Sequence, residues 1–396
     1  MKEEGISHIT HSGFISRAIR DKDINFIAFV VTPWHAISLD ATLLYLQSKG
    51  KNLKGMVLIS PHINSGINVT RDSFLGLNYE LFIHDESLPV DTTSDLLPTK
   101  SRWRKFIDRR RNHREFYRYV LFGGINWRRL PELYIINQNN PETLLGLRMR
   151  NYRHARFVLN DEGIGSYGSY FHMEAPIGDK WKGIRAWMNY FREEILARQW
   201  ICKFHQAIYT TIFKVGGRPL VPNKKVLPYY NQVLVEHANQ SKMDIHIDLS
   251  RAIVIAPSVY IEEKELYFGE DERIWQEICD ALYNKGYKLY MKPHPRDKYF
   301  KSKAVEWHCE LIDREGLSME ELCAISKPMC VIGCPSTALV TASLFYDIPA
   351  VCIVDMMNQS IVDLAKIGLE EYKRMFGSLV KYPKTMEELL KIIVEI

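Results

Sequence analysis

Three short clusters of polar residues could do chemistry, and each one follows a predicted strand. The first is Asp161-Glu162-Gly163, directly after the predicted strand at 157–159. Two adjacent carboxylates on an exposed turn can act as a general base, because neighbouring groups can shift a carboxyl pKa toward the range that a reaction needs. An ordinary acidic turn or helix N-cap is the alternative interpretation of the same residues.

The second cluster is Lys292-Pro293-His294-Pro295, at the end of another predicted strand. The two prolines fix the backbone dihedral φ and remove N–H donors on either side of His294, so the imidazole is held on a stiff loop. Imidazole titrates near neutral pH, and a rigidly held histidine suits a general acid that protonates a leaving group. An exposed loop histidine without a chemical role is the alternative.

The third cluster is Gly333-Cys334-Pro335-Ser336-Thr337, where a predicted strand turns into a predicted helix. The free backbone N–H groups of a helix start, its dipole and the two hydroxyls together favour an anion such as phosphate. Ser336 also fits an ordinary helix cap, and a cap and a phosphate site are compatible. The turn lacks the Gly-Lys pair of a Walker loop, which excludes that kind of phosphate site.

The elements that must position these clusters alternate between strands and helices. Strands are predicted at 24–31, 55–60, 81–84, 133–136, 157–159, 252–257, 287–291, 329–333 and 350–354, and helices at 39–46, from 141 onward, 271–285, 318–326 and 336–346. This alternation predicts parallel sheets that bind ligands at the carboxyl ends of their strands. We therefore predict an α/β fold of two Rossmann-like domains facing a cleft, at 1–235 and 236–396, with group transfer across the cleft.

Composition excludes several classes of protein. The chain has 396 residues, of which 46% are hydrophobic and 25% are charged, so it is neither a disordered nor a fibrous protein. No apolar run is long enough to span a membrane, and the charged start Met1-Lys2-Glu3-Glu4 does not resemble a signal peptide. The seven cysteines form no Cys-x-x-Cys pair, so we expect neither disulfides nor zinc, and a reducing cytoplasm fits best.

The positive charge is concentrated in one segment. Residues 100–130 hold eleven basic residues and two acidic ones, an excess of nine, whereas the whole chain has a net charge of only +5. Aromatic residues such as Trp103 and Phe116 are interleaved with these charges. The segment predicts contact with a polyanion or with an anionic membrane surface.

At the three clusters the chain resembles bacterial sialyltransferases. The capsule polysialyltransferases (glycosyltransferase family 38) and the lipooligosaccharide sialyltransferases (family 52) share an Asp/Glu-Asp/Glu-Gly motif, a His-Pro motif and a Ser-Ser/Thr motif in this order. Here the motifs match Asp161-Glu162-Gly163, His294-Pro295 and Ser336-Thr337. The resemblance implies a GT-B fold and an inverting, metal-independent transfer of sialic acid from CMP-sialic acid to a hydroxyl of capsular polysialic acid or lipooligosaccharide.

The resemblance also assigns catalytic roles. A carboxylate of the Asp161-Glu162 pair is then the general base on the acceptor hydroxyl, with Asp161 preferred and Glu162 the alternative. His294 resembles the general acid on the departing CMP phosphate, and Ser336 and Thr337 resemble its binding residues. The first domain is then the acceptor domain, and the second binds CMP-sialic acid.

Further donor-binding residues follow from the same resemblance. Lys292 is expected beside the cytidine, and Glu320 is expected to hold the ribose hydroxyls, with Glu321 as the less favoured choice. Pro295 and Gly333 complete the expected donor-binding set. No Asp-x-Asp motif is placed to hold a sugar-nucleotide diphosphate, and we expect neither a metal nor a cofactor.

Two segments bear on location and acceptor binding. Thr32-Pro33-Trp34-His35 resembles the Thr-Pro-Leu-Gln segment of family 52, although a packed core histidine explains His35 equally well. The aromatic stretch at 180–213 has a helical pattern, which fits a pair of core helices or an interfacial helix. We expect a cytoplasmic protein at the periphery of the inner membrane face.

Other functions remain as alternatives. A different GT-B nucleotide-sugar transferase or an epimerase would share the fold. A protein that binds a polyanion or an anionic lipid through residues 100–130 is the alternative from another class, and it leaves the His-Pro and Ser-Thr clusters unexplained. The partners that we expect are CMP-sialic acid and a sialylated or galactose-terminated acceptor, and not nucleic acid.

Overall fold

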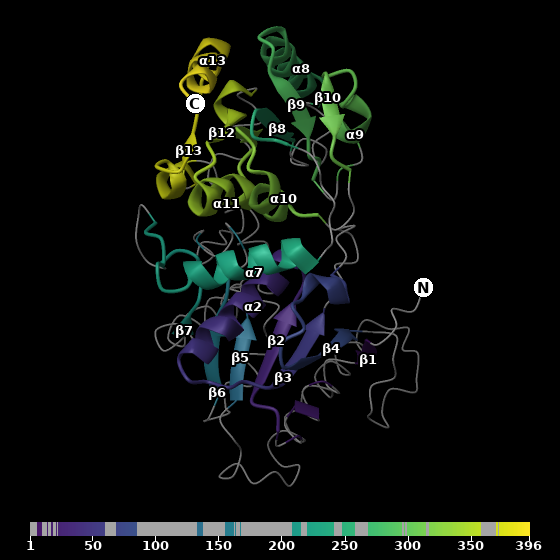
Figure 1. Ribbon diagram of the computed structural model, residues 1–396, viewed down its shortest axis with the longest axis vertical. Helices are drawn as coiled ribbons and strands as arrows, with labels where there is room; N and C mark the ends of the chain where they lie inside the picture. Colours follow the sequence, from purple (N-terminus) through teal and green to yellow (C-terminus); the bar gives the residue numbers. More distant parts are fainter. Residues whose placement is uncertain are drawn as a thin grey trace, which may run out of the picture.

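The structure, a computed structural model, contains two parallel β-sheets, one in each half of the chain (Figure 1). The residues that it describes are 6–9, 14, 17–18, 21, 23–59, 69–84, 133–137, 155–161, 163, 167, 208–214, 220–240, 248–257, 268–294, 297, 299–313, 317–357, 370 and 372–396. The predicted α/β fold of two Rossmann-like domains is confirmed.

The first sheet has seven strands in the order β1-β4-β3-β2-β5-β6-β7, and each neighbouring pair is parallel. Its strands are β1 (Ser7–Ile9), β2 (Phe26–Val30), β3 (Gly55–Ile59), β4 (Tyr79–His84), β5 (Leu133–Asn137), β6 (Ala155–Leu159) and β7 (Ile208–Tyr209). Strands β2 and β3 are buried at all their positions, as expected for apolar runs that are covered on both faces. The helix α2 (Pro33–Ser48) follows β2, and the 3-10 helix η1 (Arg71–Ser73) precedes β4.

The second sheet has six parallel strands in the order β10-β9-β8-β11-β12-β13. Its strands are β8 (Ala252–Ala256), β9 (Lys288–Met291), β10 (Cys309–Leu311), β11 (Cys330–Gly333), β12 (Ala350–Cys352) and β13 (Val380–Lys381). The helices that the structure describes in this half are α8 (Phe268–Asn284), α9 (Phe300–Lys303), α10 (Met319–Ser326), α11 (Thr337–Tyr346) and α13 (Met386–Val394), with the 3-10 helix η7 (Ile353–Met356) after β12. The strands and helices predicted for this half are found here, and β10, β13, α9 and α13 were not predicted.

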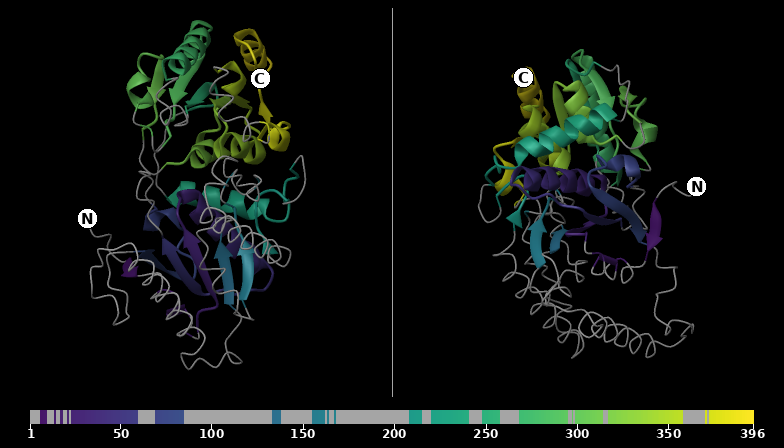
Figure 2. Two further views of the ribbon diagram at one scale, coloured as in Figure 1. Left: turned by 180° about the vertical axis from the view of Figure 1, so that it is seen from behind. Right: turned by 60° about the horizontal axis from the view of Figure 1, so that its bottom comes forward.

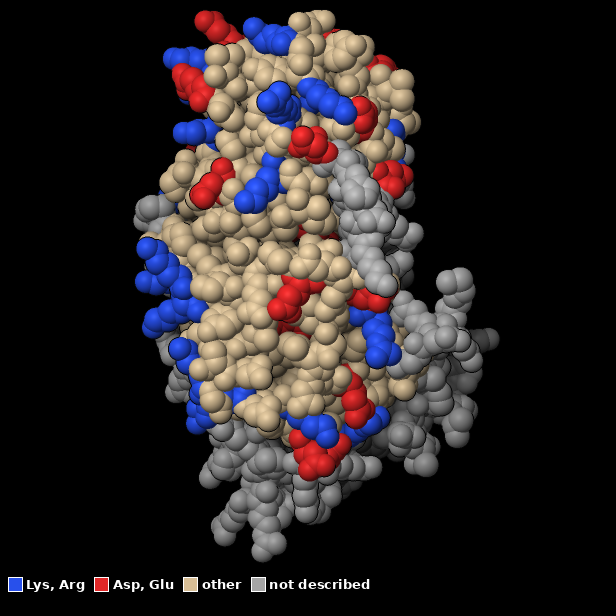
Figure 3. All heavy atoms as spheres, viewed as in Figure 1, with Lys and Arg blue, Asp and Glu red and all other residues tan. Residues whose placement is uncertain are grey.

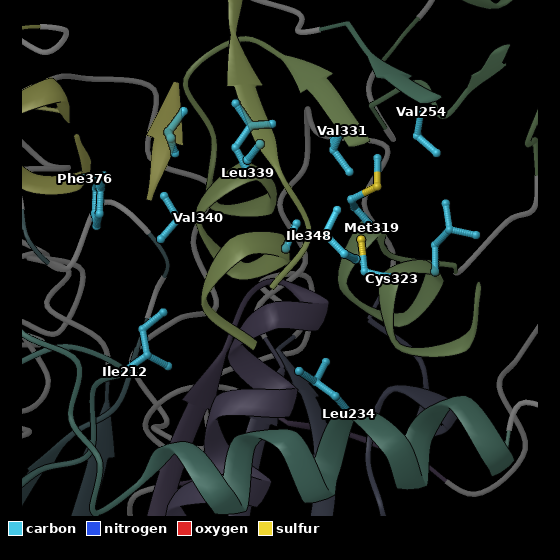
Figure 4. Packing of buried hydrophobic residues seen from close by; sticks show 14 of the residues in the cluster. Ile212, Leu234, Val254, Met319, Cys323, Val331, Leu339, Val340, Ile348 and Phe376 are labelled. Carbon is cyan, nitrogen blue, oxygen red and sulfur yellow. The ribbon is translucent and has the colours of Figure 1, made fainter. Parts of the chain in front are cut away.

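One helix, α7 (Leu227–Gln240), connects the two halves (Figures 1 and 2). It lies against α2 on one side and against α10 on the other. The hydrophobic core there is continuous, and Leu234 of α7 points toward Ile348 and Cys323 of the second half (Figure 4). The boundary predicted between residues 235 and 236 falls inside this helix.

One prediction about secondary structure was wrong at its end. The helical pattern of the stretch 180–213 does not continue through Ile208–Tyr209, because these residues form β7 and pair in parallel with β6. The run Ile208-Tyr209-Thr210-Thr211-Ile212 is rich in β-branched residues, which favour an extended chain over a helix.

Three predicted segments lie outside the described residues: the basic segment 100–130, the helix predicted from residue 141 onward and residues 180–207 of the aromatic stretch. Among the described helices, none is long and apolar enough to cross a membrane.

Candidate active site

Asp161 lies directly after β6 and is completely buried. Its Oδ1 accepts hydrogen bonds from the backbone N–H of Gly163 (2.6 Å) and from the indole Nε1 of Trp34 (3.0 Å). Its Oδ2 accepts from the backbone N–H of Ile212 (3.1 Å) and from the hydroxyl of Tyr167. The expectation of an exposed acidic turn was wrong for Asp161, because four donors offset the cost of removing its carboxylate from water.

The donors that surround Asp161 are fixed by further hydrogen bonds. The Tyr167 hydroxyl accepts from the N–H of Phe213 (3.2 Å), so its own proton points at Asp161. The N–H of Asp161 donates to Ser38 Oγ (2.7 Å), which lies 2.7 Å from the Tyr230 hydroxyl. Burial raises the pKa of Asp161, and the four hydrogen bonds oppose this shift.

The Thr32-Pro33-Trp34-His35 segment begins α2 beside this carboxylate. Thr32 is the helix N-cap and its side chain accepts from the N–H of His35 (3.3 Å). His35 is buried, and its Nδ1 accepts from the N–H of Val31 (3.2 Å). Burial lowers the pKa of His35 to about 3, so the ring is neutral at physiological pH. These contacts are those of a packed core histidine, while Trp34 is part of the site through Asp161.

The Ser336-Thr337 cluster lies at the start of α11, as predicted. Ser336 is the N-cap, and its Oγ accepts from the N–H of Leu339 (3.4 Å). The backbone carbonyl of Ser336 accepts from the Tyr372 hydroxyl (3.1 Å). Gly333 ends β11 close to β8, where a Cβ would lie 3.0 Å from the carbonyl oxygen of Ala256. The helix start therefore combines a satisfied cap with a dipole that favours an anion.

The acidic cluster (Asp161-Glu162-Gly163) and the helix start (Ser336-Thr337) are in contact with each other. Gly163 has a φ of +97°, and a Cβ at this position would overlap Thr337 Oγ1 and lie 3.4 Å from Thr337 Cβ. Only glycine allows both this backbone conformation and this close approach. Residues 163–168 also read Gly-x-Gly-x-x-Gly, a sequence pattern that was not recognised as a signal for this site. Two clusters that are far apart in the sequence thus meet across the two halves.

The Lys-Pro-His-Pro cluster follows β9 in the second half. The N–H of Lys292 donates to the carbonyl of Ile255 (2.9 Å) and extends the pairing of β9 with β8. His294 is half-buried, and its carbonyl accepts from the N–H of Asp297 (2.8 Å). Asp297, which the sequence analysis missed, also accepts from three backbone N–H groups between residues 299 and 301 (2.8–2.9 Å). It holds the histidine loop against the start of α9.

Lys292 and the acidic residues of α10 form a mostly buried polar group. Burial lowers the pKa of Lys292, and the carboxylates of Asp313, Glu320 and Glu321 oppose that shift. Burial raises the pKa of Glu320, whose Oε1 accepts from the hydroxyl of Thr341 on α11 (3.2 Å). Glu320 therefore lies between Lys292 of the Lys-Pro-His-Pro cluster and α11, the helix that carries Thr337.

Glu321 has a different role from Glu320. Its Oε2 accepts from the N–H of Ser318 (2.8 Å), and its own N–H donates to Ser318 Oγ (3.1 Å). This reciprocal pair is a capping box that begins α10. Two further expected site residues, Glu162 and Pro295, lie outside the described residues. Within the described part of the chain, no group of His, Cys, Asp and Glu is arranged to hold a metal ion.

A protein-family model described as alpha-2,8-polysialyltransferase (POLYST) matches residues 26–355, from β2 to η7. The chain belongs to the alpha-2,8-polysialyltransferase family. The resemblance to bacterial sialyltransferases is thereby confirmed, and the chain is a glycosyltransferase of the sialyltransferase class. Its two parallel sheets form the GT-B arrangement that the resemblance implied.

Several solved structures are similar to this chain at low sequence identity. A putative UDP-N-acetylglucosamine 2-epimerase from Listeria monocytogenes is 11% identical, with 94% of this chain and 87% of that chain covered and a TM-score of 0.49. The GT-B domain of a sialyltransferase from Photobacterium damselae is 12% identical, with 91% and 100% covered and a TM-score of 0.39. The E. coli heptosyltransferase WaaC with ADP is 13% identical, with 93% and 99% covered and a TM-score of 0.41. A comparison with curated proteins gave no match.

Proposed function

We propose that this protein is an inverting, metal-independent sialyltransferase that moves sialic acid from CMP-sialic acid to a hydroxyl of a bacterial surface glycan. The description of the matching family supports an α2,8-linked polysialic acid as the product. The observation that carries the proposal is the contact between Gly163 and Thr337. It brings the carboxylate cluster of one half beside the helix start of the other, as transfer from a phosphate to a hydroxyl requires.

In the proposed reaction, the acceptor oxygen attacks the anomeric carbon of sialic acid from the face opposite the phosphate. The bond from that carbon to the phosphate oxygen breaks, and its electron pair leaves with CMP. His294 protonates or hydrogen-bonds the departing phosphate oxygen, and a carboxylate of the acidic cluster takes the proton of the acceptor hydroxyl. Attack from the opposite face inverts the configuration at the anomeric carbon.

Asp161 is the preferred base and Glu162 the alternative. Asp161 already accepts four hydrogen bonds. It therefore takes a proton only when the acceptor hydroxyl replaces one of its donors. A side-chain donor, Trp34 Nε1 or the Tyr167 hydroxyl, is the exchangeable one, because the two backbone donors are fixed by the fold.

Donor binding is assigned to the second half. The single phosphate of CMP is held at the start of α11 by Ser336 and Thr337, where the helix dipole and His294 stand in for a metal clamp. Lys292 lies beside the cytidine, with Pro295 and Gly333 shaping the same site. Glu320 holds the ribose hydroxyls. The use of Glu321 in a capping box supports this choice between the two acids.

The basic segment 100–130 is assigned either to binding of the acceptor or to attachment of the enzyme at the membrane surface. A polysialic acid chain and the anionic inner face of the cytoplasmic membrane are both polyanions, and either one fits an excess of nine positive charges. On the face that Figure 3 shows, acidic and basic side chains of the described second half are interspersed, without a field of one sign. We place the enzyme in the cytoplasm, peripheral to that membrane.

The proposal is tested by CMP release from CMP-sialic acid in the presence of a sialylated acceptor, with mass spectrometry of the product. Transfer should be lost in His294→Asn and kept in the matched control His308→Asn, because His308 is an exposed histidine at a φ of 54° that asparagine tolerates. Full activity of His294→Asn contradicts the assignment of the general acid. Full activity of the double variant Asp161→Ala/Glu162→Ala contradicts the assignment of the general base.

Competition separates the alternatives. Inhibition by CMP but not by UDP or GDP fits the proposed donor, whereas preference for UDP or GDP indicates another nucleotide-sugar transferase or an epimerase. Tight, strongly salt-dependent binding of DNA or RNA without any CMP binding indicates a polyanion-binding protein instead.

A further inference from the structure

Tyr372 contacts the backbone at the point where α11 begins. Its hydroxyl donates to the carbonyl oxygen of Ser336 at 3.1 Å, across 36 positions of the sequence. The residue is 3% exposed, and its ring lies 5.0 Å from that of Phe376 and 6.3 Å from that of Tyr382, measured between ring centroids. Because the ring is packed on both of these neighbours, the position of the hydroxyl is fixed.

This hydrogen bond has a directional consequence at the helix start. The carbonyl of Ser336 and the N–H of Thr337 belong to one planar peptide unit and point in opposite directions. Fixing the carbonyl on one side therefore fixes the direction in which the Thr337 N–H points. Donation to the carbonyl also polarises that peptide unit and strengthens its N–H as a donor.

The aromatic group that holds Tyr372 also reaches the other half. Phe376 lies 6.3 Å from the ring of Tyr167 and 5.4 Å from that of Phe213, and Figure 4 shows it beside Val340 of α11. Tyr167 is the phenol that donates to Asp161. One packed group of rings thus contains the phenol that contacts the carboxylate and the phenol that contacts the helix start.

We propose that Tyr372 is a positioning residue for the donor phosphate: it aims the Thr337 N–H by holding the Ser336 carbonyl. This inference rests on the proposed function, in which that helix start receives the phosphate. The side-chain cap of Ser336 does not replace the hydrogen bond from Tyr372. The cap joins Ser336 Oγ to the N–H of Leu339 and leaves the Ser336 carbonyl out. Tyr372 contacts no substrate in this proposal and acts through the peptide unit.

The test compares Tyr372→Phe with Tyr382→Phe. The Tyr382 hydroxyl is buried and has no hydrogen-bond partner among the described residues, so its removal is the matched control. Calorimetry gives the affinities of the full-length variants for CMP and for cytidine, which lacks the phosphate. We expect Tyr372→Phe to weaken CMP about tenfold, or ~1.4 kcal/mol, and to leave cytidine within about twofold. Tyr382→Phe should leave both within about twofold.

A purely structural role gives a different result. If Tyr372→Phe weakens CMP and cytidine equally, or weakens neither while lowering the melting temperature, the positioning role is overturned. The same titrations are run with UMP and uridine. A wild-type preference for UMP over CMP overturns the proposed donor. The role of Tyr372 is then still tested by whether Tyr372→Phe lowers the affinity for UMP more than the affinity for uridine. A wild-type protein that prefers neither nucleotide to its nucleoside overturns both proposals.

Discussion

Replacement of Gly163 by alanine tests the contact between the acidic cluster and the helix start. The added Cβ would overlap Thr337 Oγ1. A φ of +97° also costs an alanine ~1–2 kcal/mol more than a glycine, and overpacking of a filled site costs ~1–3 kcal/mol. The two effects together predict a loss of about 2–5 kcal/mol in the free energy of unfolding. Transfer activity should fall as well, because either the acidic loop or Thr337 has to move.

The strain and the overlap can be measured separately. Gly286 has a φ of +85° with nothing within 4 Å of its would-be Cβ, so Gly286→Ala measures the strain alone. Thr337→Ala removes the overlapping hydroxyl and leaves the nearest remaining atom at 3.4 Å. In the double variant Gly163→Ala/Thr337→Ala, the destabilisation should therefore approach that of Gly286→Ala. Activity should stay low, since Thr337 is a proposed phosphate ligand.

Urea unfolding of the four variants supplies the free energies, and CMP release supplies the activities. The contact is refuted if Gly163→Ala and Gly286→Ala are equally destabilised. It is also refuted if Thr337→Ala restores none of the lost stability. An inactive Gly163→Ala protein of unchanged stability would show that the glycine matters for the substrate and not for this contact.

The other predictions concern single groups. Asp161→Asn places an amide N–H against donors and should cost ~2–4 kcal/mol in the free energy of unfolding as well as transfer activity. Normal urea unfolding contradicts the buried carboxylate, and normal CMP release makes Glu162 the base. Burial lowers the pKa of His35 to about 3. As the pH falls below 6.5, His35 is therefore protonated in the unfolded chain while it stays neutral in the folded protein. This group should therefore remove up to ~1.4 kcal/mol of stability per pH unit in that window. His35→Asn keeps an acceptor for the Val31 N–H and should flatten the slope of unfolding free energy against pH; an unchanged slope contradicts the neutral, buried ring. Lys292→Met should raise the KM for CMP-sialic acid about tenfold with little change in melting temperature, and an unchanged KM removes Lys292 from the donor site.

The central strands could be predicted because each is a short apolar run between breaker residues. The five residues of β2 are all buried, which is the burial that such a run implies. The edge strands β1, β10 and β13 could not be predicted, since a strand of two or three residues with one neighbour needs no hydrophobic run. The helix α7 was also missed, because its place is set by packing between two halves that are distant in sequence.

The chemical clusters could be predicted from residue type and spacing at strand ends, but their surroundings could not. Trp34 and Asp161 are 127 positions apart, and Tyr372 and Ser336 are 36 apart. Such pairs are created by the tertiary fold and leave no local pattern. The burial of Asp161 was missed for the same reason: Asp-Glu-Gly indicates an exposed turn unless donors from α2 and from the chain after β7 are known to converge on it.

The charges around the site differ between its two sides, and this difference suits the proposed transfer. The hydrogen-bond donors to Asp161 are all neutral N–H and O–H groups, and no cation is paired with it among the described residues. A neighbouring cation would lower the pKa of this carboxyl, whereas burial raises it, so the arrangement yields a stronger base than an ion-paired aspartate. On the other side, the positive end of the α11 dipole belongs to the half assigned to the donor, whereas the charge of Lys292 is balanced by the carboxylates of Asp313, Glu320 and Glu321. Neutral donors around the proposed base and the positive end of a helix at the proposed phosphate site favour movement of the proton and of the negative charge in opposite directions, as the transfer requires.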